Sequence, residues 1–182
     1  MKVIPTDIEG LLIIEPRVFR DARGYFFESY SRRAFFEATG QDVEFVQDNQ
    51  AESSYGVIRG LHFQKGEHAQ AKLVRVIRGA VLDVAVDIRP GSPTYGRHVA
   101  VELSGDNFRQ LFIPRGFAHG YAVLSEKALF HYKVDNPYCP QSEGAILWND
   151  PALAIDWHLP PSAIILSEKD SLNPPLSLSL PI

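Results

Sequence analysis

The sequence predicts an all-β protein, built as a sandwich or a barrel. Many short segments are rich in β-branched and aromatic residues, the composition typical of strands. Turn signals separate these segments, among them Arg89-Pro90-Gly91-Ser92-Pro93 and Ser104-Gly105-Asp106-Asn107. Short strands at this spacing favour a sandwich or barrel over alternating strands and helices.

The predicted strands follow one another along the chain with a few residues between them. Most are runs of valine, isoleucine, leucine and aromatic residues, which fit the pleated and half-buried surface of a sheet. In chain order they are Leu11–Glu15, Phe45–Gln47, Val57–Phe63, Leu73–Ile77, Val81–Ile88, Val99–Leu103, Gln110–Ile113, Tyr121–Leu124, Ala128–Val134 and Gly144–Trp148.

One segment carries clear helix signals. A helix is predicted over Arg32–Thr39, with Ser31 as N-cap and Gly40 as C-cap. The tail from Asn173 is rich in proline and serine and ends apolar, so we expect it to pack along the surface of this chain or of a partner. Because no repeat, low-complexity tract or linker is visible, residues 1–182 are predicted to form a single domain.

Composition narrows the class of protein. The 182 residues are 45% hydrophobic and 22% charged, as in ordinary globular proteins. A net charge of -4 argues against general nucleic-acid or membrane-surface binding. We see no apolar run of membrane-spanning length and no signal peptide. The single cysteine, Cys139, excludes an internal disulfide framework and a cysteine-rich zinc site. We therefore expect a cytoplasmic protein with neither nucleic-acid nor membrane partners.

A histidine and a lysine ten residues apart are the strongest chemical signal. Lys72 shares one face of its predicted strand with Val74 and Val76, and a lysine on an apolar face is unusual. A histidine base beside a desolvated ammonium suits proton abstraction next to a carbonyl, where the cation stabilises the developing enolate. His62 and Lys72 could play these parts. Alternatively, Lys72 could reach water from the beginning of its strand.

Several motifs carry a family resemblance. Two segments, from Gly60 to Gly79 and from Pro114 to His119, resemble the motifs of cupin barrels. Six segments in register resemble the dTDP-4-dehydrorhamnose 3,5-epimerase family of the RmlC-like cupin group: Asp21–Glu28, Gln47–Asn49, Arg59–His62, Gly116–Gly120, Leu147–Asp150 and Leu166–Asp170. The resemblance covers nearly the whole chain. It implies a cupin-type double-stranded β-helix, or jelly-roll barrel, with a few short helices.

The resemblance also implies a reaction. The family inverts C3 and C5 of a dTDP-linked 6-deoxy-4-ketohexose through enolates, without a cofactor or metal, and works as a homodimer. Carried over to this chain, His62 is the base and Asp170 orients its imidazole. Lys72 stabilises the enolate oxygen, and Tyr132 returns a proton from the opposite face.

Substrate-binding residues follow from the same resemblance. Arg23, Arg59 and Lys169 suit the diphosphate, and Phe26 and Tyr138 offer flat faces to thymine or sugar. Polar groups for the base, the ribose or the sugar are Glu28, Gln47, Asn49, Glu143 and His119. Because N-terminal segments of the family reach the neighbouring subunit, Arg23 and Glu28 are candidates for crossing the interface.

Alternatives remain at several positions. Asp170 follows Ser167 by three residues and could stabilise a turn, and Tyr132 could be a core aromatic. Cupin enzymes usually bind a metal through a His-x-His pair, but here Gln64 replaces the second histidine. Glu67, His68 and His119 could in principle join His62 around a metal, although their spacing does not fit one strand face.

Other functions also fit parts of the sequence. They are a C3-only epimerase, a non-catalytic sugar-nucleotide-binding cupin and a metal-dependent dioxygenase. One departure from the family is Tyr121, where phenylalanine is usual, and it adds a hydroxyl to the predicted site.

Overall fold

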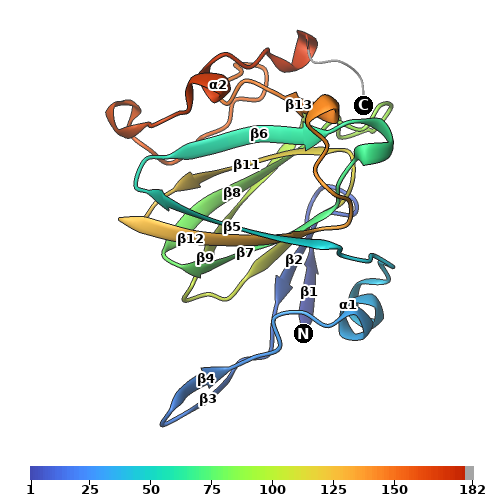
Figure 1. Ribbon diagram of the computed structural model, residues 1–182, viewed down its shortest axis with the longest axis vertical. Helices are drawn as coiled ribbons and strands as arrows, with labels where there is room; N and C mark the ends of the chain where they lie inside the picture. Colours follow the sequence, from blue (N-terminus) through green and yellow to red (C-terminus); the bar gives the residue numbers. More distant parts are fainter. Residues whose placement is uncertain (179–182) are drawn as a thin grey trace.

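Two β-sheets pack face to face in the computed structural model, which describes residues 1–178 (Figure 1). Neighbouring strands are antiparallel throughout both sheets. The larger sheet has six strands in the order β1 (Lys2–Pro5), β2 (Leu12–Glu15), β10 (Gln110–Ile113), β7 (Lys72–Arg78), β12 (Lys127–Val134) and β5 (Gln47–Ser54). The smaller sheet has five, in the order β13 (Glu143–Ala145), β6 (Ile58–Gln64), β11 (Phe117–Val123), β8 (Ala80–Asp87) and β9 (His98–Ser104).

The main core lies between the sheets. Val74, Leu111 and Phe130 of the larger sheet pack with residues such as Ala85 and Val123 of the smaller one, and all five are buried. Side chains alternate between the two faces of each strand, so the inward residues of both sheets meet in this layer. The all-β prediction is confirmed.

The C-terminal part of the chain covers the outer face of the smaller sheet, above β6 in Figure 1. Leu153, Trp157 and Leu176 pack there against Leu82 and Val86 of β8. This part includes the short helix α2 (Glu168–Ser171) and 3-10 turns at Pro161–Ala163 and Leu176–Leu178. Further 3-10 turns lie at Gly66–His68 and Pro140–Ser142. The tail therefore packs on its own chain as far as it is described, while residues 179–182 lie outside the described part.

The predicted helix is confirmed. Helix α1 spans Arg32–Thr39, and the Ser31 side chain accepts a hydrogen bond from the Ala34 N–H. Gly40 closes the helix in the left-handed conformation with φ 70°, which favours glycine. None of the helices within residues 1–178 has the length and apolar character needed to cross a bilayer.

Two strand predictions are wrong in position. The strand predicted at Phe45–Gln47 is instead β5, which overlaps it only at Gln47. Its sequence is almost entirely polar, because one face points to solvent and the other to a polar cavity, so no apolar run marks it. The strand predicted at Gly144–Trp148 ends at Ala145. Strand β1 and the hairpin of β3 (Phe19–Asp21) and β4 (Gly24–Phe26) were not predicted.

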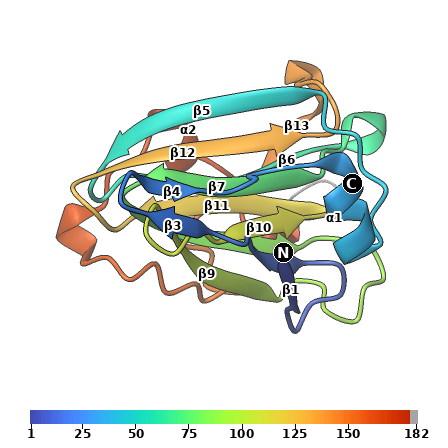
Figure 2. The same ribbon diagram turned by 90° about the horizontal axis from the view of Figure 1, so that it is seen from below.

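The β3–β4 hairpin extends away from the two sheets in Figure 1, and it lies in front of them in the view from below in Figure 2. It forms a separate two-stranded sheet, and its large side chains Phe19, Tyr25 and Phe26 are exposed. Tyr25 and Phe27 pack edge-on against Phe108 at the base of the hairpin, with ring centroids 4.8 and 5.3 Å away. This aromatic cluster anchors the hairpin while its tip remains free of the barrel.

Candidate active site

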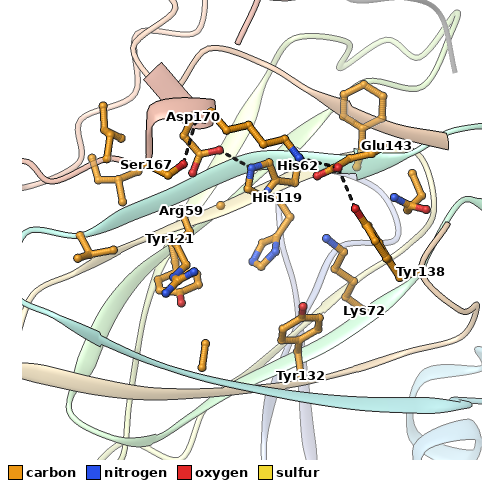
Figure 3. A pocket seen from close by; sticks show the side chains of 18 of the residues that line it. Arg59, His62, Lys72, His119, Tyr121, Tyr132, Tyr138, Glu143, Ser167 and Asp170 are labelled. Atoms are coloured by element: carbon orange, nitrogen blue, oxygen red, sulfur yellow. Dashed lines mark hydrogen bonds and ion pairs between the residues drawn. The ribbon is translucent and has the colours of Figure 1, made fainter. Parts of the chain in front are cut away.

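A cavity of about 470 Å³ opens between the two sheets. Strands of both sheets line it, together with the loop after β12 and the segment leading into α2 (Figure 3). The four predicted catalytic residues and five predicted binding residues are among its lining: His62, Lys72, Tyr132, Asp170, Arg59, His119, Tyr138, Glu143 and Lys169. Residues from distant parts of the sequence thus meet in one cavity.

His62 and Asp170 form a close pair. His62 Nε2 lies 2.6 Å from Asp170 Oδ1, and Asp170 is buried. Burial raises the pKa of Asp170, but the hydrogen bond and charge of His62 outweigh this, so its pKa lies below the ordinary value. Asp170 is therefore a carboxylate, and the imidazole donates its Nε2 proton to it. This pairing fixes the tautomer of His62 and leaves Nδ1 free to accept a proton.

The chain places Asp170 through two local features. Ser167 Oγ accepts a hydrogen bond from the Asp170 N–H, which caps α2. Upstream, Ile165 pairs with Val57 in a parallel bridge and its carbonyl accepts from the Ile58 N–H, which ties the segment to the beginning of β6. The capping contact and the contact with His62 therefore coexist.

Lys72 is buried in the cavity wall, with 9% of its surface exposed. The alternative in which it reaches solvent is thus wrong. Burial lowers the pKa of its ammonium group to about 8, and the nearby negative charge of Asp83 opposes part of this effect. The group is still charged at neutral pH, and a desolvated cation interacts strongly with a developing oxyanion.

A second histidine–carboxylate pair lies deeper in the barrel. His119 Nε2 is 3.0 and 3.1 Å from the two carboxylate oxygens of Asp83, and both residues are buried. Burial lowers the pKa of His119, with Asp83 acting in the opposite direction, so the ring is neutral near pH 7. Sequence reasoning missed Asp83, although a carboxylate inside the apolar run of β8 was an available signal.

Tyr132 faces His62 across the cavity. His62 belongs to β6 of the smaller sheet and Tyr132 to β12 of the larger one, and Figure 3 shows the Tyr132 hydroxyl pointing into the space between them. Burial raises the pKa of Tyr132, so the phenol keeps its proton at neutral pH. The arrangement therefore holds a proton acceptor and a proton donor on opposite walls.

Three polar side chains form a cluster at the exposed side of the cavity. Glu143 Oε2 accepts hydrogen bonds from Tyr138 Oη at 2.9 Å and from Lys169 Nζ at 2.6 Å. Burial raises the pKa of Glu143, but these two contacts bring it below its ordinary value. Because Tyr138 and Lys169 are mostly exposed, a ligand entering the cavity can reach them.

Arg59 lies on the other side of the cavity from Tyr138 (Figure 3). Its Nε donates to Ser53 Oγ at 3.0 Å. Tyr121 pairs with Arg59 in the β6–β11 register, and its buried hydroxyl has no hydrogen-bond partner among residues 1–178. The additional hydroxyl expected from the sequence therefore does lie in the cavity wall.

Five predicted binding residues lie outside the cavity lining. Gln47 and Asn49 occupy the same face of β5 as Ala51, which lines the cavity, and Gln47 Nε2 donates to Asn49 Oδ1 at 2.9 Å. The other three belong to or follow the β3–β4 hairpin. Arg23 pairs with Asp21 at 2.6 Å within that hairpin, while Phe26 is 71% exposed. Glu28 is exposed beyond β4.

The metal alternative gains no support from this geometry. Over residues 1–178, no three side chains of histidine, cysteine, aspartate or glutamate gather into a group that could hold a metal ion. His68 instead contacts Ser142 Oγ through Nδ1 at 3.0 Å.

Known proteins match the chain over almost its full length. The sequence profile of the family described as dTDP-4-dehydrorhamnose 3,5-epimerase matches residues 5–177. The enzyme of that name from Escherichia coli (strain K12) is 58% identical over 170 residues, which is 93% of this chain and 91% of the relative.

Solved structures show the same likeness in three dimensions. The crystal structure of dTDP-4-dehydrorhamnose 3,5-epimerase from Elizabethkingia anophelis NUHP1 is 54% identical, with a TM-score of 0.93 and coverage of 97% of both chains. The RmlC enzyme from Legionella pneumophila Philadelphia 1, solved with dTDP-4-keto-L-rhamnose, is 50% identical with a TM-score of 0.94, covering 97% of this chain and 93% of that one. These likenesses confirm the RmlC-like cupin fold. The chain belongs to the dTDP-4-dehydrorhamnose 3,5-epimerase family and is an epimerase.

Proposed function

We propose that this enzyme inverts C3 and C5 of dTDP-4-dehydro-6-deoxy-D-glucose and so forms dTDP-4-dehydro-L-rhamnose. One observation carries the proposal: the His62–Asp170 pair and the Tyr132 phenol occupy opposite walls of one cavity, beside the buried ammonium of Lys72. Inversion of a carbon next to a ketone needs a base on one face and an acid on the other. The relative from Legionella, whose structure contains dTDP-4-keto-L-rhamnose, supports the choice of substrate.

The first chemical step is removal of a proton next to the C4 ketone. His62 accepts this proton at Nδ1, and the C–H electron pair forms the carbon–carbon double bond of an enolate. The negative charge moves to the C4 oxygen, where the Lys72 ammonium stabilises it. Asp170 stabilises the imidazolium through the 2.6 Å contact to Nε2.

The second step returns a proton to the opposite face. Tyr132 donates its phenolic proton to the carbon, the double bond electrons form the new C–H bond, and the ketone is restored. The phenolate then regains a proton from solvent, while His62 releases its own. Repetition of both steps at the second carbon gives double inversion without any net gain or loss of protons.

The remaining lining residues serve to hold the nucleotide. We assign Arg59 and Lys169 to the diphosphate because guanidinium and ammonium groups pair with phosphate oxygens. The exposed ring of Tyr138 suits stacking with thymine, and Glu143 can accept hydrogen bonds from the base or ribose. Gln47, Asn49 and His119 supply further hydrogen bonds to the base, the ribose or the sugar.

We also propose that the enzyme works as a homodimer in which the hairpin crosses to the partner. Phe26 lies on β4, Arg23 in the turn before β4 and Glu28 just after β4, and all three are exposed. Figure 1 shows this hairpin extending away from the two sheets. Exposed aromatic residues on a protruding hairpin suit burial in an interface. A second copy can supply these three residues to the cavity described above.

Proton NMR of the keto-sugar nucleotide in deuterated water tests the proposed reaction. We expect deuterium to enter at both C3 and C5 and the doubly inverted sugar to accumulate. Exchange and inversion at C3 alone would identify a C3-only epimerase instead. If neither carbon exchanged, the proposed reaction would be wrong.

A further inference from the structure

The Tyr121 hydroxyl is an unusual group in this cavity wall. The residue is 5% exposed, and its oxygen is inaccessible to solvent yet forms no hydrogen bond of ordinary geometry with the described residues. An unpaired buried hydroxyl is unfavourable by about 1–3 kcal/mol. Such a group in a binding cavity calls for a functional explanation.

The ring of Tyr121 is held firmly, so its hydroxyl oxygen cannot move toward another partner. It stacks on Phe130 with ring centroids 4.2 Å apart and planes 15° from parallel. Phe130 itself is fully buried in the core between the sheets. Stacked rings inside a close-packed core have little freedom to move. The position of the hydroxyl is therefore fixed by the barrel.

Two polar neighbours face this hydroxyl. Burial raises the pKa of Tyr121, and the hydrogen-bonding groups of Ser53 and Arg59, which lie near the hydroxyl without ordinary hydrogen-bond geometry, lower it in part. Ser53 is buried on β5, and its Oγ already accepts from Arg59 Nε. Both neighbours thus lie close to the hydroxyl, on the side of the cavity that Arg59 lines.

Arg59 is the exposed member of this group. Within residues 1–178, its hydrogen bonding is confined to Nε. Its two terminal nitrogens are thus available to a ligand. A small shift of the guanidinium would let one terminal N–H reach the Tyr121 oxygen while the others faced an anion, because the group presents five donors in a fixed fork.

We propose that Tyr121 is a positioning residue for substrate binding. Together with Ser53, its hydroxyl orients the Arg59 guanidinium toward the diphosphate of the substrate. This inference rests on the proposed function, which assigns the diphosphate to Arg59. Ser53 holds Nε, Tyr121 holds one terminal nitrogen, and the remaining donors face the phosphate oxygens. Binding of the anion then satisfies the hydroxyl that is unpaired in the ligand-free site.

Calorimetric binding of thymidine diphosphate, with thymidine measured by NMR titration, tests the proposal. Tyr121→Phe removes only the hydroxyl, so we expect affinity for the diphosphate to fall about three- to tenfold, the worth of one hydrogen bond. Affinity for thymidine should not change, because thymidine has no phosphate. Tyr95→Phe is the matched control, since Tyr95 is exposed on the loop between β8 and β9. Equal diphosphate affinity in Tyr121→Phe and wild type would overturn the proposal.

A double-mutant cycle separates positioning from direct contact. If Tyr121 acts through Arg59, Tyr121→Phe should have no further effect on diphosphate binding in an Arg59→Ala background. Additive losses would mean that the hydroxyl contacts the ligand itself, and would overturn the positioning role. Ser53→Ala should weaken diphosphate binding in the same selective way, and it provides the test if Tyr121→Phe does not fold.

Different outcomes test the proposed substrate and the role of Tyr121. If the wild-type enzyme bound no thymidine diphosphate, both the nucleotide-linked substrate and the role of Tyr121 would be wrong. If the wild type bound it and Tyr121→Phe bound it equally well, only the inference about Tyr121 would be wrong.

Discussion

The cavity between the sheets and the β3–β4 hairpin differ in how they position polar residues. In the cavity, His62, Lys72 and Tyr132 lie on long strands that pair with neighbours on both sides. In the hairpin, Phe26 lies on a three-residue strand that pairs only with the other strand of the hairpin, and Arg23 lies in the turn between the two. The cavity residues therefore come together within one chain, whereas the hairpin residues lie away from the cavity of that chain.

This difference shows which functional groups a single chain can place by itself. Strand pairing and a close-packed core fix the side chains of the barrel, as catalytic geometry requires. The hairpin packs against Phe108 through Tyr25, Phe27 and Arg20, so we expect its turn to gain a fixed position from a second surface.

The largest effect is expected in the barrel at His62. His62→Ala should reduce deuterium exchange at C3 and C5 by about four orders of magnitude, because no other base is proposed at that wall. The fold should persist, since His62 is partly exposed and Ala fits a strand. NMR exchange at substrate saturation measures the loss, and circular dichroism checks the fold. Normal exchange in this variant would assign the base elsewhere.

Tyr132→Phe should separate proton removal from proton return. His62 can still remove a proton and return it, or an exchanged deuteron, to the same face. We therefore expect deuterium exchange to continue while inversion falls by about two to four orders of magnitude. Tyr55→Phe, on an exposed turn, is the matched control. A wild-type yield of the doubly inverted sugar from Tyr132→Phe would show that the proton comes from another donor.

The same contrast decided what could be predicted from the sequence. Helix α1 and the apolar strands were readable because caps and β-branched runs are local signals. Strand β5 was missed because its polar residues gain their order from eight pairings with β12 and not from a local pattern. The hairpin was missed for a related reason, since its exposed aromatics belong to no apolar face of this chain.

The site was predictable in composition but not in full arrangement. The motifs of the family resemblance placed His62, Lys72 and Asp170 in one site, and the structure brings them together. Asp83 was missed because its contacts with His119 and its charge effect on Lys72 join residues far apart in the sequence. The contact between Asp83 and His119 depends on the register of β8 with β11, and a local sequence pattern does not predict that register.

If the hairpin crosses to the partner subunit, an Arg23 variant and a His62 variant should complement each other in a mixed dimer. Arg23→Ala should lower kcat/KM about 10- to 100-fold, as expected for loss of a charged contact to phosphate. Mixing it with His62→Ala under conditions of subunit exchange should restore about one quarter of wild-type activity, because half of random dimers are mixed and each has one intact site. Absence of any recovery, with exchange confirmed by mass spectrometry, would place Arg23 in the site of its own chain.

The smallest effect is a pH dependence that arises from Lys72. Its pKa of about 8 means that the ammonium is mostly charged at pH 7 and mostly neutral at pH 9. If the charge stabilises the enolate, kcat/KM should fall about tenfold across this range, with a midpoint near pH 8, because kcat/KM reports the pKa values of the free enzyme. The titration of Lys72 does not destabilise the fold over this pH range, so unfolding caused by this residue cannot explain the loss of activity. Between about 8 and 10.5 the unfolded chain binds the lysine proton and the folded chain does not, so this group makes folding more favourable as pH rises. Circular dichroism at each pH checks that the fold is retained.

Lys72→Arg is the control variant, because its guanidinium stays charged over the whole pH range. The pH profile of this variant should show no step near pH 8, whatever its activity at neutral pH. Persistence of the step in Lys72→Arg would assign it to another group.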